Sequence, residues 1–468
     1  MMRALALLLG ACLLGGCQSM PWRAKPGAPA TPEVPAQWRT PTVTTENMAT
    51  QDWRGVFRGP ELTALIDEAL RANSDLRIAA ARVAEARGRY GVQESQRWPT
   101  LGLNAQYQRQ RQPGAGPDNV DSEIGSLGLA LPAWEIDLWG RLRDLSEAAR
   151  QNLLATEEAQ SAVQVSLIAQ VALAYIDLLE LDAEAQVAEA TIKTRQQSLR
   201  MVELRFKAGV VAGVDLQQAR TSLATAEQAQ SDIERRRSST ENALAVLVGR
   251  NPGAVARAVR LADFPLPQAL GAGLPSSLLQ RRPDLRAAER ALAASAANVE
   301  AARKAFFPSI SLTGFLGVVS PELAALFDGG REAWSVSPAV TLPIFTAGRL
   351  SANLDAARAG QEIAAEGYRQ SVRNAFLEVE NTLVAYQRLR EQRLAFDRVV
   401  AADRERLRLV ELRYQNGVSS YFEVLDSQRQ LFASELSQLR TTSLTYAAVV
   451  QLYRALGGGW TAPAEPAS

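Results

Sequence analysis

Residues 348–416 read GRLSANLDAARAGQEIAAEGYRQSVRNAFLEVENTLVAYQRLREQRLAFDRVVAADRERLRLVELRYQN, and this stretch decides the fold. It contains no proline, and its apolar residues are spaced alternately four and three positions apart: Val372, Phe376, Val379, Leu383 and Tyr386. This spacing places them on one seam of a helix, as in a coiled coil. At about 1.5 Å per residue the helix would be roughly 100 Å long. It therefore needs partners of similar length to cover its seam.

An earlier part of the chain repeats this unit at an offset of 208 residues. Residues Val202–Val210 align without a gap with Val410–Val418, and Gly140–Leu142 align with Gly348–Leu350. A repeat kept in register over such a distance indicates a duplicated structural unit. We therefore expect two tandem repeats of long coiled-coil-like helices, 46–250 and 283–456. A Pro- and Gly-rich equatorial linker, 251–282, would join them, and a C-terminal tail, 457–468, would follow.

Each repeat also contains two segments in which apolar and other residues alternate, as in β-strands with two different faces. They lie at about 100–110 and 123–132 in the first repeat, and at about 309–318 and 333–343 in the second. Their length of roughly 9–11 residues suits a tilted membrane strand. Aromatic residues cluster at their ends, as at a membrane interface: Trp98, Tyr107, Trp134, Trp139, Phe306, Phe307 and Trp334. The alternative is a small soluble sheet that caps the helices.

Four strands are too few to close a membrane barrel, since the smallest bacterial barrels have about eight. The open edges must then pair with other copies of the chain, and symmetric association is the usual solution. The sequence therefore predicts a closed homo-oligomer, whose copy number this argument leaves open.

The N-terminus predicts export and lipid attachment. Residues 1–16 have a basic start and an apolar run, which are typical of a signal peptide. They end in Leu14-Gly15-Gly16 before Cys17, a pattern similar to bacterial lipoproteins, in which this cysteine carries the lipid. The alternative is a secretory signal that is cut elsewhere. Residues 17–45 are rich in proline and predict an extended tether. No uninterrupted apolar run of 18 residues follows, so we expect no transmembrane helix.

Composition argues against several function classes. The chain of 468 residues has a net charge of +1, no histidine and only two cysteines, Cys12 and Cys17. Without histidine the commonest general base and metal ligand is missing, so we predict no enzyme and no metal site. No basic stripe suggests nucleic acid. We expect no cofactor other than the lipid on Cys17. A lipid-tethered coiled-coil rod would explain the helices but leaves the four alternating segments unexplained.

Four stretches resemble the outer membrane factor family, the TolC- and OprM-like exit ducts of bacterial efflux pumps: 273–289, 307–314, 425–432 and 455–460. The lipoprotein start is similar to the branch that serves resistance-nodulation-division (RND) pumps. The resemblance implies a homotrimer with a 12-stranded β-barrel in the outer membrane, continuous with a 12-helix α-barrel in the periplasm. Its partners would be a periplasmic adaptor, an inner-membrane RND-type transporter and outer membrane lipid.

The implied function is a passive exit duct for small molecules such as drugs. The alternatives are a duct for type I protein secretion or for metal-ion efflux. The lipoprotein start favours small-molecule efflux only weakly, because the transporter sets the cargo.

A duct needs a gate, and the two repeats differ just beyond their helix-ending glycines. The second repeat has Asp426 and Arg429 where the first has Gln218 and Thr221. Asp426 and Arg429 lie three residues apart and could pair on one helix face. By resemblance to the OprM-like branch, Asp426 is the aperture aspartate, Arg429 its partner and Phe422 an apolar constriction. The alternative is an ordinary surface pair.

The helix ends resemble the tips that meet the adaptor. The residues concerned are Arg205, Gly209, Val210, Arg413, Gly417 and Val418. Glycine at these positions also serves to end a helix, and the two roles are compatible. Tyr421 could belong to the core or to the aperture, and the sequence does not decide between them.

Overall fold

The duplicated segments form helices of equal length in both repeats. The computed structural model describes residues 34–40, 48, 51–113, 119–265 and 271–458. Its long helices are α5 (Arg141–Lys207) and α9 (Arg349–Gln415) with 67 residues each, α6 (Gly213–Leu247) and α10 (Tyr421–Ala455) with 35 each, and α4 (Ser74–Ser95) and α8 (Pro283–Lys304) with 22 each. The shorter elements are α2 (Trp53–Val56), α3 (Pro60–Ala72), α7 (Ser277–Arg281), η4 (Leu261–Asp263) and η5 (Leu323–Ala325). The mainly helical fold with two long coiled-coil-like helices is confirmed.

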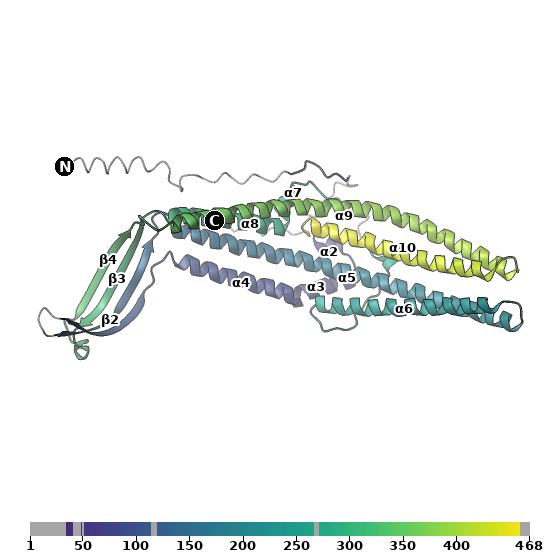
Figure 1. Cartoon of the computed structure of the whole chain (residues 1–468), viewed down its shortest axis with the longest axis horizontal. Coiled ribbons are helices and arrows are strands. Elements are labelled where there is room, and N and C mark those ends of the chain that lie inside the picture. The colour runs from purple at the N-terminus through teal and green to yellow at the C-terminus, as the bar shows by residue number, and fades with distance from the viewer. Residues whose placement is uncertain (1–33, 41–47, 49–50, 114–118, 266–270, 459–468) are drawn as a thin grey trace. The chain divides into compact units, whose positions relative to one another are not determined.

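The described residues fall into two compact units. The first comprises Arg82–Glu157 and Ala287–Arg369 and holds the β-sheet. The second comprises Pro32–Ala81, Glu158–Arg286 and Gln370–Ser468 and holds α6 and α10. In Figure 1, α5 turns back into α6 and α9 turns back into α10, so that each repeat ends in a helical hairpin. The C-terminal tail of the sequence lies mostly outside the described residues.

The sheet has four antiparallel strands in the order β1-β2-β3-β4. They are β1 (Gly102–Pro113), β2 (Asn119–Ile136), β3 (Ser309–Ser320) and β4 (Glu332–Thr341). The number of strands is as predicted, but β2 is longer than the expected 123–132. Its register shifts between Leu131 and Trp134, after which Trp134 to Ile136 pair with β3 again. Pro132 interrupts the alternation in the sequence at this irregularity, which is where a strand tolerates proline.

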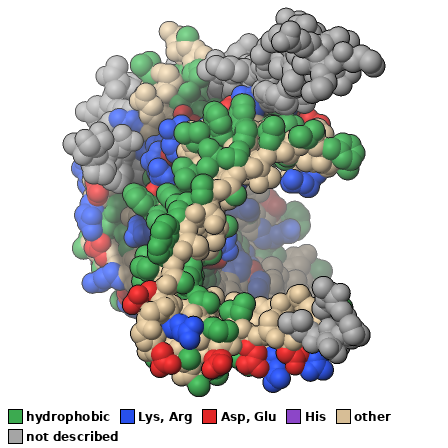
Figure 2. Space-filling model, turned by 90° about the vertical axis from the view of Figure 1, so that its left-hand side faces the viewer, with side chains coloured by type: hydrophobic (Ala, Val, Ile, Leu, Met, Phe, Trp, Pro, Cys, Tyr) green, Lys and Arg blue, Asp and Glu red, His purple; other side chains and the backbone are tan. Residues whose placement is uncertain are grey.

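The two faces of the sheet differ in chemistry. Directly paired positions place Leu103, Leu129, Leu316 and Trp334 in one row across all four strands. Their side chains are 75%, 49%, 62% and 76% exposed. The opposite face carries mainly small and polar residues, with Phe315 and Val319 as larger apolar exceptions; the polar ones include Asn104, Gln106, Ser126, Thr313, Ser335 and Ser337. Figure 2, which views the strand end, shows hydrophobic side chains gathered at the surface. A row of exposed apolar residues across a whole sheet is unusual for a soluble monomer.

The helix seams predicted from the spacing are covered. Val372, Val379 and Leu383 of α9 are buried, and the Phe376 ring lies 6.0 Å from the ring of Trp38. Helix α5 contains an 18-residue window of mean hydropathy 1.7, long and apolar enough to cross a membrane. The expectation of no transmembrane helix considered only uninterrupted apolar runs and did not anticipate this window. More than half of the window (56%) is buried inside the protein, as in a core helix.

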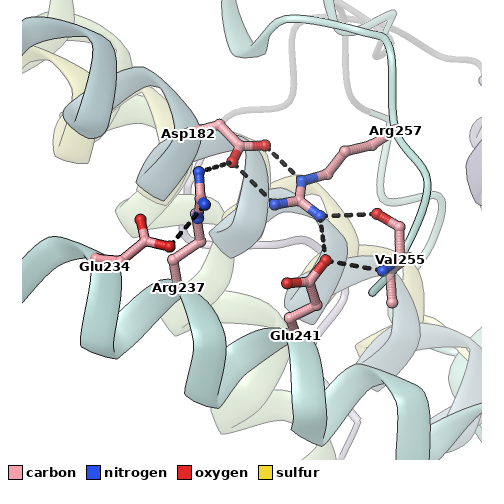
Figure 3. A network of polar contacts seen from close by, with 6 residues as sticks. All are labelled: Asp182, Glu234, Arg237, Glu241, Val255 and Arg257. Atoms are coloured by element: carbon pink, nitrogen blue, oxygen red, sulfur yellow. Dashed lines mark hydrogen bonds and ion pairs between the residues drawn. The ribbon is translucent and has the colours of Figure 1, made fainter. Parts of the chain in front are cut away.

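A polar network ties the segment after α6 to the helices, as Figure 3 shows. The Arg257 guanidinium donates to Asp182 of α5 at 2.9 Å, to Glu241 of α6 at 2.8 Å and to the carbonyl of Val255 at 2.8 Å. Glu241 accepts the N–H of Val255 at 2.7 Å, and Arg237 joins Asp182 to Glu234. The Arg257 side chain is 12% exposed. This part of the predicted linker is therefore held in place by paired charges as well as by the buried side chains of Val255, Leu261 and Phe264.

Candidate gate and helix tips

Both helical hairpins turn through the same backbone motif. The N–H of Gly209 donates to the carbonyl of Phe206, and the N–H of Val210 donates to that of Arg205, both at 2.9 Å. In the second repeat, Gly417 and Val418 make the equivalent bonds at 3.1 and 2.9 Å. The glycines have φ angles of +72° and +71°, which are strained for other residues. The pattern is a Schellman motif, so the predicted role of these glycines in ending the helices is correct.

The predicted docking residues lie at the exposed ends of the hairpins. Val210 and Val418, the first residues beyond the glycines, are 70% and 66% exposed. Arg413 is also exposed, but Arg205 is half-buried because its guanidinium lies 4.6 Å above the ring of Tyr414. The two repeats therefore present two similar apolar tips, and one arginine of the pair is used for packing.

A small core joins the two hairpins just behind the tips. It contains Val202 of α5, Leu216 and Ala219 of α6, Tyr414 of α9, and Tyr421, Val424 and Leu425 of α10. The Tyr414 and Tyr421 rings lie 5.5 Å apart. Burial raises the pKa of Tyr421 to about 12, and the neighbouring Tyr414 contributes to the rise. Tyr421, which the sequence left unassigned, therefore belongs to the core.

The three predicted gate residues share the opposite face of α10. Phe422, Asp426 and Arg429 are spaced four and three residues apart, and all three are exposed. The residues between them that point to the core, such as Val424 and Leu425, are buried. The structure thus brings an apolar, an acidic and a basic side chain onto one free face of α10.

Asp426 has a different charged neighbour from the one expected. Its carboxylate lies 4.0 Å from the guanidinium of Arg406 on α9, which is also 3.9 Å from Asp403. No ion pair joins Asp426 to Arg429 within the described part of the chain, so the role of Arg429 as the partner of Asp426 stays a prediction. Asp426 lies nearer to Arg406 than to Arg429 because α9 runs beside α10 at this point. Sequence reasoning missed Arg406, although the repeat provides a signal: the first repeat has Ser198 at this position.

The start of α10 is also fixed more firmly than that of α6. Ser420 and Glu423 have the sequence and geometry of a capping box, in which the N–H of Ser420 donates to Oε1 of Glu423 at 3.4 Å. Helix α6 begins after Ala212, which offers no side-chain cap. A good N-cap contributes about 1 kcal/mol. The hairpin that carries the charged face is thus the one with the better defined helix start.

Two further predictions concern metal ions and the lipid anchor on Cys17. In the parts of the chain that the structure describes, no group of three or more acidic, Cys or His residues is placed to hold a metal ion. Cys17 lies outside the described residues, as do the signal peptide and most of the tether.

Comparison with known proteins shows which class has this architecture. The chain superposes on the crystal structure of the open state of the Neisseria gonorrhoeae MtrE outer membrane channel with a TM-score of 0.84. The two sequences are 34% identical, and the match covers 93% of this chain and 98% of that one. The fold is therefore that of an outer membrane channel protein. The model of the outer membrane efflux protein family matches residues 65–250 and 274–458, and the chain belongs to this family.

Two curated relatives are similar along nearly their whole length. The solvent efflux pump outer membrane protein SrpC of Pseudomonas putida is 40% identical over 460 residues, which are 96% of this chain and 97% of SrpC. The cation efflux system protein CusC of Escherichia coli O6:H1 is 37% identical over 454 residues, again 96% and 97% of the two chains. The chain is thus an outer membrane efflux protein, and its relatives serve more than one kind of cargo.

Proposed function

We propose that three copies of this chain close into one duct through the outer membrane, which passively conducts small molecules delivered by an inner-membrane transporter. In this proposal the three sheets form a 12-stranded β-barrel and the helices form a 12-helix α-barrel in the periplasm. The protein acts as a channel and not as an enzyme.

The apolar row across the sheet carries this proposal. Leu103, Leu129, Leu316 and Trp334 face outward on one side, while mainly small and polar side chains occupy the other. A membrane barrel needs this arrangement, with the apolar face toward lipid and the polar face toward the lumen. The outer edges of β1 and β4 have no partner strand in the described chain, so neighbouring copies would complete the hydrogen bonding.

We place the gate on the free face of α10. Around a threefold axis, copies of Asp426 would form an acidic ring, which favours cations, and Phe422 would narrow the opening one turn nearer the tip. The Arg406–Asp426 contact would hold α10 against α9 when the gate is closed. The core of Val202, Tyr414 and Tyr421 provides the rigid support from which such a gate can move.

We propose one partner for the exposed tips of the two hairpins and another for Cys17. The exposed tips at Val210 and Val418 would receive the periplasmic adaptor, which links the duct to an RND-type transporter. A lipid on Cys17 would anchor the N-terminus in the outer membrane, with residues 17–45 as the tether.

Small organic molecules are the first proposed cargo, since SrpC belongs to a solvent efflux pump. Cations are the second candidate, because CusC belongs to a cation efflux system and Asp426 is exposed on the gate face. The two candidate cargoes differ in charge. An acidic ring of Asp426 side chains would raise the flux of cations and would have little effect on the flux of neutral molecules. Replacing Asp426 should therefore lower the flux of cations relative to that of neutral molecules through the open duct.

The test combines oligomer mass with conductance. Protein purified in neutral detergent should have the mass of three chains and should produce discrete conductance steps in a planar bilayer. Asp426→Cys should cross-link between copies with a short thiol reagent and should block conductance, whereas Gln218→Cys at the equivalent position of α6 should not. A monomer that stays soluble without detergent would refute the assembly. Absence of cross-linking at Asp426→Cys in a conducting trimer would refute the position of the gate.

A further inference from the structure

A groove of about 390 Å³ lies between the two hairpins, away from the gate face of α10. Its apolar lining comes from α5, α9 and α10: Val187, Leu407, Leu431, Phe432 and Leu439. The volume is within the range of about 300–1,000 Å³ in which proteins hold small ligands. The groove is mostly apolar, yet one cationic side chain reaches it.

This cation, Arg195 of α5, is only 3% exposed. One terminal nitrogen, Nη1, donates to the carbonyl of Ser222 on α6 at 2.7 Å. Its Nε has no hydrogen-bond partner, and no ion pair joins Arg195 to a carboxylate anywhere in the described chain. The Phe432 ring lies 5.4 Å from the guanidinium carbon. A buried charge without a counter-ion is costly, and proteins normally pair or solvate it.

The surroundings of the Arg195 guanidinium favour a negative charge beside it. Burial lowers the pKa of Arg195, and the positive charge of Arg429 lowers it further. The nearby acid of the groove, Glu435, is already paired with Arg404 at 2.7 Å. Gln428 is 5% exposed, donates to Ser198 at 3.3 Å, and has an Oε1 atom without a partner. The groove thus contains an unpaired donor and an unpaired acceptor beside apolar walls.

We propose that this groove binds a small organic anion, a carboxylate attached to an apolar or aromatic body. The positive charge of the Arg195 guanidinium holds the carboxylate. Phe432 and the leucines enclose the apolar body, and the Gln428 Oε1 accepts a hydroxyl where the ligand has one. The proposed ligand is distinct from the conducted cargo.

Calorimetric titration of the full-length protein in neutral detergent tests the proposal, with protein-free micelles as the blank. The probes are 2-naphthoate and its neutral analogue 2-naphthol, which have the same ring system. We expect 2-naphthoate to bind at least tenfold more tightly than 2-naphthol. Arg195→Gln should remove this preference, whereas Arg200→Gln, an exposed arginine of the same helix outside the groove, should keep it.

A second variant leaves Arg195 in place and fills the groove. Ala190 lines the groove and is exposed, so Ala190→Phe should weaken 2-naphthoate binding at least tenfold without changing the thermal unfolding midpoint. This variant decides the question if Arg195→Gln fails to fold. Equal affinity for the two probes, or unchanged binding by Ala190→Phe, would show that Arg195 only ties α5 to α6 and would overturn the proposal.

Discussion

Replacing Asp426 by alanine is the sharpest test of how the duct is held closed. The pair with Arg406 has a 4.0 Å separation, and the two side chains are 57% and 42% exposed. Such an exposed pair contributes about 0.5 kcal/mol. If three copies open together, the closed state loses about 1.5 kcal/mol, which corresponds to a roughly tenfold higher open probability. Single-channel recording in planar bilayers measures this quantity directly.

The identity of the partner can be established in the same assay. Arg406→Gln should raise the open probability as Asp426→Ala does, and the double variant should add little to either single change. Arg429→Gln should have a smaller effect, because the structure contains no Asp426–Arg429 pair. Gln218→Ala, at the equivalent position of α6, is the matched control.

Salt provides an independent check on the physical cause. At about 1 M salt the screening length falls to roughly 3 Å, so the difference between the wild type and Asp426→Ala should shrink. An open probability that falls in Asp426→Ala would mean that repulsion within the acidic ring exceeds the attraction to Arg406. That result, or strict additivity of the two single changes, would refute the reasoning.

Three further outcomes follow from the packing. Gly317→Ala places a Cβ atom at 2.5 Å from the Cα of the facing glycine, so the assembled oligomer should be lost on native gels, whereas Gly329→Ala, in open space, should assemble normally. Arg257→Met leaves Glu241 without its arginine and Asp182 with only the 3.6 Å contact to Arg237, and it should lower the free energy of unfolding by about 2 kcal/mol in thermal melts, whereas the exposed Arg260→Met should change it little. Burial acts to raise the pKa of Glu241, but the N–H of Val255 and the guanidinium of Arg257 more than offset it, so the pKa lies below 4.5. Its stabilising effect is complete above pH 4.5 and is lost as the pH falls through the lower folded-state value, so Glu241→Gln should remove part of the acid sensitivity of the melting midpoint.

The sequence by itself determined the kinds of element and their order. Steps of four and three residues predict a helix seam, alternation predicts strands, and the repeat of Val202–Val210 at Val410–Val418 predicts matched hairpins. These signals are reliable because the hydrogen bonds of a helix, and the two-sided geometry of a strand, depend on residues close together in the chain. The helix-ending glycines were recognisable for the same reason.

Tertiary structure decided which side chains meet. Adjacent residues of α10 have opposite environments, Tyr421 in the core and Phe422 at the surface, and Asp426 contacts Arg406 instead of Arg429. The burial of Arg195 without a carboxylate was equally invisible in the chain. These outcomes depend on how each long helix is rotated about its axis and shifted along its neighbour. Contacts between residues far apart in sequence set that rotation, so a local sequence pattern cannot predict it.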